Sequence, residues 1–251
     1  MNNDNKDDND NDKKNTMVFV EPRVFDICPF ILNHYVDVLG EQDWQYVFYC
    51  GKNTKQFWEK TKLNPIYEIR ELEVTNFSNA SEYSDFMKSK ALWESLKGEF
   101  VLTAQMDTWI FSHPPYPYRI QDFIQTNKSY IGGNMCYDWQ ELHREQISCE
   151  YKNFNGGLSL RKRLDMLRVI ENFPPQITQP NSNTIYTDAE DVYFTVGCYK
   201  LGLPVGDDEY SSHFAIHTHF KEGFGIHKPY YGCENEVHNA YPYLKYMNRF
   251  I

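Results

Sequence analysis

The stretch that decides the fold is Phe100-Val101-Leu102-Thr103-Ala104, which runs directly into Gln105-Met106-Asp107-Thr108. Its apolar, β-branched and small side chains predict a fully buried strand. Such strands are typical of a parallel sheet that helices cover on both faces. The polar residues after Ala104 then lie at the carboxyl edge of the sheet, where open α/β proteins bind their ligands.

Before this strand, short apolar runs alternate with helical patterns. Strands are predicted at residues 17–20, 44–50 and 67–72, and amphipathic helices at 25–39, 54–60 and 79–96. In the helices, apolar residues recur at three- and four-residue spacing. Strands separated by helix-length spacers predict a mostly parallel sheet with right-handed crossovers.

After Trp109 this rhythm changes. A short strand is predicted at 129–133, a glycine turn at Asn155-Gly156-Gly157, a basic helix at 161–171 and a last helix at 187–201. No boundary divides residues 17–251, so we expect a single α/β domain there. Residues 1–16 are almost purely Asn, Asp and Lys, which predicts a disordered tail because they bury no apolar area.

Composition and charge limit the classes of molecule that we expect this protein to bind. Aromatic residues make up 16% of the 251 residues, and flat rings stack on sugars and nucleobases, although they also fill ordinary cores. The net charge is −10. A protein that binds duplex nucleic acid normally presents a basic face, so we expect no nucleic-acid partner.

The cysteines and the hydropathy bear on the compartment. The six cysteines lie far apart and form no Cys-x-x-Cys pair, which argues against a zinc ribbon or a redox dithiol. Residues 1–16 lack the apolar segment of a signal peptide, and no apolar run approaches the roughly 20 residues of a membrane span. We therefore expect a cytoplasmic protein with free thiols and no membrane span.

Asp107 is the first candidate for chemistry. A carboxylate at the end of a buried strand can hold a hard cation that bridges two phosphates. An aspartate that only caps a turn is the alternative. Further along, His227 and Lys228 follow a glycine turn. A neutral imidazole at His227 can ligate the same cation, and the ammonium of Lys228 can neutralise a departing diphosphate.

Two further segments are candidates. The paired glycines at Asn155-Gly156-Gly157 permit close approach of a ligand to the backbone, and Arg161 and Lys162 could face a phosphate there; a plain tight turn is the alternative. Glu190 and Asp191 open a predicted helix, where acids suit the helix dipole on any protein. In an inverting transferase one of them, first Asp191 and second Glu190, would deprotonate the acceptor hydroxyl.

Several of these motifs occur in one recognisable order. They are Glu21-Pro22-Arg23, the strand led by Trp44, Gln105-Met106-Asp107-Thr108, Tyr130-Ile131-Gly132, Asn155 to Arg161, Glu190 to Phe194, and Phe224 to Pro229. In this order the chain resembles a family of predicted GT-A-type glycosyltransferases found in giant viruses, plants and bacteria. The Asn- and Asp-rich tail also resembles proteins of A/T-rich giant-virus genomes, which would place this one in the host cytoplasm.

The resemblance implies a GT-A-like, Rossmann-like fold and the transfer of a hexose from a UDP- or dTDP-sugar to a glycan or glycoprotein. By this likeness Asp107 and His227 hold Mn²⁺ or Mg²⁺, and Asp191 is the base. The segment Asn155 to Gly157 lines the sugars, and Gln105 stands where the family's first metal-binding acid falls.

Two other functions stay open at this stage. An inactive sugar-binding module on the same fold would explain the incomplete acidic motif at Gln105. A metalloprotein built on His213, His217 and His219 is the other, since His217 and His219 would share one face of an extended segment. No spacing among these histidines completes an organised ligand set.

Overall fold

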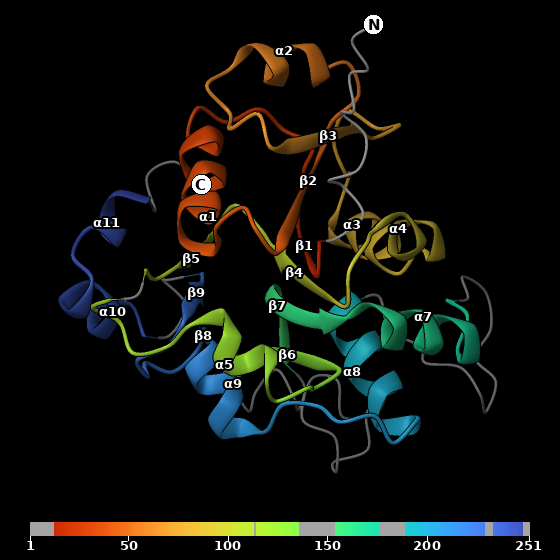
Figure 1. Ribbon diagram of the computed structural model, residues 1–251, viewed down its shortest axis with the longest axis vertical. Helices are drawn as coiled ribbons and strands as arrows, with labels where there is room; N and C mark the ends of the chain where they lie inside the picture. Colours follow the sequence, from red (N-terminus) through yellow and green to blue (C-terminus); the bar gives the residue numbers. More distant parts are fainter. Residues whose placement is uncertain (1–12, 113, 136–153, 176–188, 229–232, 248–251) are drawn as a thin grey trace, which may run out of the picture.

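The computed structural model describes residues 13–112, 114–135, 154–175, 189–228 and 233–247, and its main sheet has the order β3-β2-β1-β4-β7-β6 (Figure 1). The strands are β1 (Asn15–Glu21), β2 (Trp44–Cys50), β3 (Tyr67–Glu71), β4 (Phe100–Ala104), β6 (Tyr130–Asn134) and β7 (Phe154–Lys162). The first four are parallel, and β7 pairs antiparallel with both β4 and β6. The mostly parallel sheet predicted from the sequence is confirmed.

Helices cover both faces of this sheet (Figure 1). On one face lie α1 (Cys28–Leu39), α2 (Lys55–Lys60), α5 (Ile120–Ile124), α9 (Asp208–Phe214), α10 (Glu234–Ala240) and α11 (Leu244–Met247). On the other face lie α3 (Ala80–Met87), α4 (Lys90–Ser95), α7 (Arg163–Asn172) and α8 (Glu190–Lys200). Within the described ranges, every helix is too short or too polar to cross a bilayer.

The apolar strands belong to two cores, one on each face of the sheet. In β1, Met17 and Phe19 pack with α1, whereas Val18 and Val20 pack with the opposite layer. Successive side chains of a strand point to opposite faces, so a strand covered on both sides is apolar throughout. This accounts for the continuous apolar runs in the sequence.

A small second sheet borders the first. It consists of β5 (Thr108–Ile110), β9 (Gly225–His227) and β8 (Ala215–Ile216), in the order β5-β9-β8. Thr108 pairs with His227 in this sheet. The pairing brings the segment after β4 next to His227, which joins two distant stretches of the chain. The glycine turn predicted before His227 is wrong, because Gly225 lies in β9 itself.

Several predicted boundaries differ from the structure. The strand predicted from Met17 begins two residues earlier, at Asn15, whose backbone N–H donates to Asp43. The helix predicted at 79–96 is two helices, since Ser89 is extended and its hydroxyl caps the N–H of Leu92. A serine or threonine hydroxyl that starts a new helix this way is a local N-cap. Residues 1–12 of the predicted tail lie outside the described residues.

Candidate functional site

Two cavities lie at the carboxyl edge of the parallel strands. One, the α8 cavity, has a volume of about 440 Å³ and is lined by the predicted residues Gln105, Asn155, Gly157, Glu190, Asp191, His227 and Lys228. The other, the β1 cavity, has a volume of about 330 Å³ and contains Asp107. The two share Ala80, Tyr83 and Gln105. Residues that are far apart in the sequence therefore meet at one site.

The turn after β4 is held from two sides. The N–H of Gln105 donates to the carbonyl of Gly157 at 3.0 Å, and the N–H of Lys228 donates to the carbonyl of Asp107 at 2.9 Å. Lys228 has a positive φ of 50°, which is uncommon for a residue other than glycine. The backbone bond to Asp107 helps to hold Lys228 in this conformation, with its side chain at the α8 cavity.

Asp107 and His227 form a close pair. His227 is buried, with Nε2 at 3.3 Å from Oδ1 of Asp107. Among the described residues, Nδ1 of His227 has no hydrogen-bond partner. Burial alone would raise the pKa of Asp107, but its interactions with His227 and Lys228 outweigh burial and lower that pKa. The carboxylate is therefore ionised over the whole physiological range.

This pair fits the metal that the resemblance implies. Two neighbouring ligands of an octahedral cation, each about 2.1 Å from it, lie about 3 Å apart. The Asp107–His227 separation of 3.3 Å is close to that value. Within the described ranges no third His, Cys, Asp or Glu joins them. Substrate phosphates and water would have to complete the shell, as is common for Mg²⁺.

The segment Asn155-Gly156-Gly157 is not the predicted glycine turn before a helix. It lies inside β7, and the helix that follows, α7, begins only at Arg163. Gly132 of β6 pairs with Ser159 and Gly133 pairs with Asn155, so residues 156–158 bulge out of the β6–β7 pairing. A bulge re-aims the backbone of a strand, and here it directs Gly157 into the α8 cavity.

The two glycines are required by close neighbours and not by positive φ angles. A Cβ atom at Gly156 would overlap the carboxylate of Glu190, and one at Gly157 would overlap the ring of His227. Asn155 supports the bulge, because its Oδ1 accepts the N–H of Gly157 at 2.8 Å. The bulge therefore sets how closely α8 and β9 approach β7.

Asp191 lies in the first turn of α8, at the wall of the α8 cavity. Its Oδ1 accepts the N–H of Val192 at 2.8 Å, and its Oδ2 accepts the N–H of Gly156 at 3.2 Å. Burial and the neighbouring charge of Glu190 raise the pKa of Asp191 from 3.8 to about 6, although these hydrogen bonds and Arg161 act against the increase. A carboxylate with this pKa is suited to general-base catalysis near neutral pH.

Arg161 and Glu190 do not have the predicted roles. Arg161 is fully buried, and its guanidinium makes contacts of 2.6 and 3.0 Å with the carboxylate of Glu190. The rings of Tyr130 and Phe194 pack over the guanidinium. Arg161 therefore cannot face a phosphate in the cavity, and Glu190 is committed to an ion pair and is not free to act as the base.

Lys162, the other predicted phosphate contact, also lies away from the site. Its ammonium contacts Asn127 at 2.7 Å and Glu99 at 3.1 Å. Residues alternate across a strand, so Lys162 points to the opposite side from Arg161. The basic pair after the glycines therefore has a structural role.

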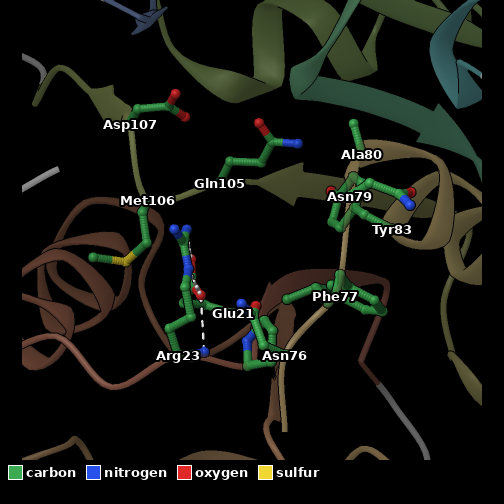
Figure 2. A pocket seen from close by; sticks show the side chains of 12 residues that line it. Glu21, Arg23, Asn76, Phe77, Asn79, Ala80, Tyr83, Gln105, Met106 and Asp107 are labelled. Atoms are coloured by element: carbon green, nitrogen blue, oxygen red, sulfur yellow. Dashed lines mark hydrogen bonds and ion pairs between the residues drawn. The ribbon is translucent and has the colours of Figure 1, made fainter. Parts of the chain in front are cut away.

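The β1 cavity contains residues to which the sequence assigned no role. Glu21 ends β1, and its carboxylate binds Arg23 through contacts of 2.8 and 2.9 Å. Figure 2 shows the Arg23 side chain pointing toward the segment that carries Gln105 and Asp107. Tyr83, from α3, lines both cavities. The Glu21-Pro22-Arg23 motif was the only available sequence signal for this wall.

The histidine metal set predicted as an alternative is wrong. His217 stacks on His227 with ring centroids 5.0 Å apart, and burial and His227 lower its pKa to about 3. His213 instead stacks on Tyr118, and His219 is exposed. Within the described part of the chain the three do not form a ligand group. His217 therefore belongs to the wall of the α8 cavity as a neutral ring.

Comparison with known proteins identifies a family. A family model with the description "Protein of unknown function (DUF5672)" matches residues 66–230, which include α3, β4, β7, α8 and His227. No curated protein matches the chain. Because the match spans more than half of the sequence, the chain belongs to the DUF5672 family.

Proposed function

We propose that this chain is a glycosyltransferase that moves a sugar from a nucleoside diphosphate donor to an acceptor hydroxyl, with inversion at the transferred carbon. The observation that carries the proposal is the α8 cavity. It brings together a carboxylate with a raised pKa at Asp191, the ammonium of Lys228 and the backbone of Gly157. Next to it, the Asp107–His227 pair has ligand spacing.

The diphosphate of the donor would lie between the two cavities. Asp107 and His227 would hold Mn²⁺ or Mg²⁺ there, and a bound cation offsets the charge on the phosphates as the leaving group departs. Lys228 adds a positive charge from the protein itself, at the edge of the α8 cavity. The nucleoside would occupy the β1 cavity, where Phe77 offers a flat ring and Asn76 an amide.

The chemistry proposed for Asp191 is a single displacement. Its carboxylate takes the proton of the acceptor hydroxyl while the oxygen attacks the anomeric carbon of the sugar. The bond from that carbon to the phosphate oxygen breaks on the opposite face, and the electron pair leaves with the nucleoside diphosphate. A base with a pKa of about 6 is ionised at neutral pH and still accepts a proton readily.

The fold is compatible with this proposal. The sheet is mostly parallel, and both cavities lie at the carboxyl edge of β1 and β4, the usual ligand position of such sheets. A GT-A-type architecture is the finer assignment that we propose on this basis. The acceptor class that we propose is a glycan or a glycoprotein, and the donor a UDP- or dTDP-sugar.

The test is a thermal-shift screen of UDP-, dTDP- and GDP-sugars, each with and without Mn²⁺, followed by an assay for nucleoside diphosphate release. A bound donor stabilises the fold by mass action, so at least one donor should raise Tm, and more so with Mn²⁺. Asp191→Asn should keep this shift and abolish release. Binding of glycans with no response to any nucleotide sugar would instead favour the inactive sugar-binding module.

A further inference from the structure

The ion pair between Arg161 and Glu190 is unusual in its placement. Both side chains are buried, at 0% and 4% exposure. Arg161 is itself fixed, since its Nε donates to the hydroxyl of Ser159 at 2.8 Å and the Tyr130 ring lies 4.9 Å from the guanidinium. A buried ion pair is weak support for stability, because an apolar pair of similar size often stabilises a fold as well or better.

The pair also connects two elements at the start of α8. Glu190 is the first residue of α8, and Ala189 before it provides no side-chain cap. The Arg161–Glu190 contacts therefore connect the start of α8 directly to β7. A cationic guanidinium near the N-terminus of a helix interacts unfavourably with the helix dipole. Stabilisation of the helix therefore does not account for the presence of Arg161.

A closed set of contacts links this ion pair to Asp191. The guanidinium of Arg161 reaches the carbonyl of Gly156 at 3.5 Å, and the hydroxyls of Thr103 and Ser159 donate to the same carbonyl at 3.2 Å. The N–H of Gly156 in turn donates to Oδ2 of Asp191. Arg161 thus holds Asp191 from two directions, through Glu190 on α8 and through Gly156 in the bulge.

From this geometry we propose that Arg161 and Glu190 are positioning residues, which hold the carboxylate of Asp191 in the α8 cavity and set its local charge. The inference rests on the proposed function for its catalytic meaning. Glu190 then supports Asp191 and does not serve as the second base that the sequence predicted. In this role neither residue takes part in the proton transfer.

The charged and titratable groups around Asp191 show how the pair would act. Those that face it are Glu190 on α8, Arg161 on β7, Tyr130 on β6, and Tyr83, His217, His227 and Lys228 on the other cavity walls. Glu190 makes the proton on Asp191 harder to remove, and Arg161 makes it easier. Removing Glu190 alone and removing both partners should therefore have different effects.

The experiment uses the full chain and the nucleotide sugar that gives the thermal shift. In Glu190→Gln, the midpoint of the rate against pH should fall by ~0.5 units or more, since a neighbouring negative charge is lost. In the apolar double variant R161M/E190L, which should fold, this midpoint should stay near that of the wild type. Its kcat should nevertheless fall at least ~10-fold at unchanged donor Kd, because the base is less well held.

Arg168→Met is the matched control. This arginine lies on the neighbouring α7 and is exposed, with one ion pair to Asp165, so its removal should leave both kcat and the pH midpoint unchanged. A folded R161M/E190L protein with kcat within ~2-fold of the wild type would overturn the positioning role. So would a Glu190→Gln variant with the wild-type pH midpoint.

A second measurement does not depend on turnover. If the wild type releases no nucleoside diphosphate from any donor, the proposed function fails. The positioning role is then decided by protein stability alone. In the wild-type background, Asp191→Asn becomes the more stable protein above a certain pH. In the Glu190→Gln background this pH should be lower. An unchanged pH overturns the inference.

Discussion

Asp191→Asn should make this protein more stable while it removes catalysis. Burial and Glu190 raise the pKa of Asp191 from 3.8 to about 6. Each pKa unit corresponds to about 1.4 kcal/mol, so the ionised carboxylate costs the folded state about 3 kcal/mol at neutral pH. This is an upper value, because Asp191 is partly open to the solvent of the cavity.

The substitution also has a cost. Asparagine has one acceptor oxygen, so it can satisfy only one of the two N–H groups, of Val192 and Gly156, that now donate to the carboxylate. A lost hydrogen bond of this kind costs about 1 kcal/mol. The net gain is then about 2 kcal/mol, which for a chain of this size raises Tm by about 4–8 °C.

The pH dependence gives the sign of the effect. A carboxyl group whose pKa is raised in the folded state stabilises that state only while it stays protonated there. The wild type should therefore lose stability between about pH 4 and about pH 6. These limits are the pKa values of Asp191 in the unfolded and the folded state. Above this range Asp191→Asn should be the more stable protein, and below it the wild type should be the more stable by about 1 kcal/mol, because the variant lacks one hydrogen bond.

The assay is chemical denaturation of both proteins at a series of pH values, with the donor-release rate measured in parallel. In the wild type this rate should increase with pH through about 6 as the base ionises. Asp37→Asn, at an exposed position of α1, is the control and should change stability by less than about 0.5 kcal/mol. The reasoning is refuted if Asp191→Asn is less stable than the wild type at pH 8.

Three further predictions concern the walls of the two cavities. Gly157→Ala should destabilise the fold by about 1–3 kcal/mol, because its Cβ overlaps the His227 ring; adding His227→Ala should recover part of the loss in a denaturation series. Asp107→Asn should abolish the extra Tm shift that Mn²⁺ gives with donor, with an unchanged shift counting against the metal pair. Arg23→Ala should raise donor Kd about 10-fold, because it removes a charge from the β1 cavity. The exposed Lys52→Ala should not change donor Kd, and equal titration curves for both variants would remove Arg23 from the donor site.

Local patterns were enough for much of the fold. The β2 strand has the predicted bounds, Trp44–Cys50, and α1 ends at Leu39 with Gly40 as its C-cap, as predicted. These features depend on the spacing of apolar side chains and on the positive φ of 76° at Gly40, which glycine adopts easily. They are properties of a few consecutive residues, and the sequence contains them in full.

The sequence also indicated where ligands would lie. The carboxyl end of β4 is a ligand-binding edge in any sheet of this type, so Gln105 and Asp107 were identified without any contact information. Asp191 was identified in the same way, as an acid at the start of a helix. The cavities confirm only their location; their chemistry stays a prediction.

Tertiary structure decided the roles of the remaining residues. The paired glycines read as a turn, because a glycine selected for close approach and one selected for positive φ look alike in a sequence. Only the positions of Glu190 and His227 show that the cause is steric. The same holds for Arg161, whose charge predicts a phosphate contact until a buried partner is known.

The sequence by itself determined the spacing of apolar residues that marks each helix or strand, and the order of these elements along the chain. It also determined which polar residues follow the ends of the strands. Which of those residues meet was decided by the bulge in β7 and by the pairing of Thr108 with His227. Both join segments that are distant in the chain. Their formation depends on packing between layers, and no local pattern encodes such packing.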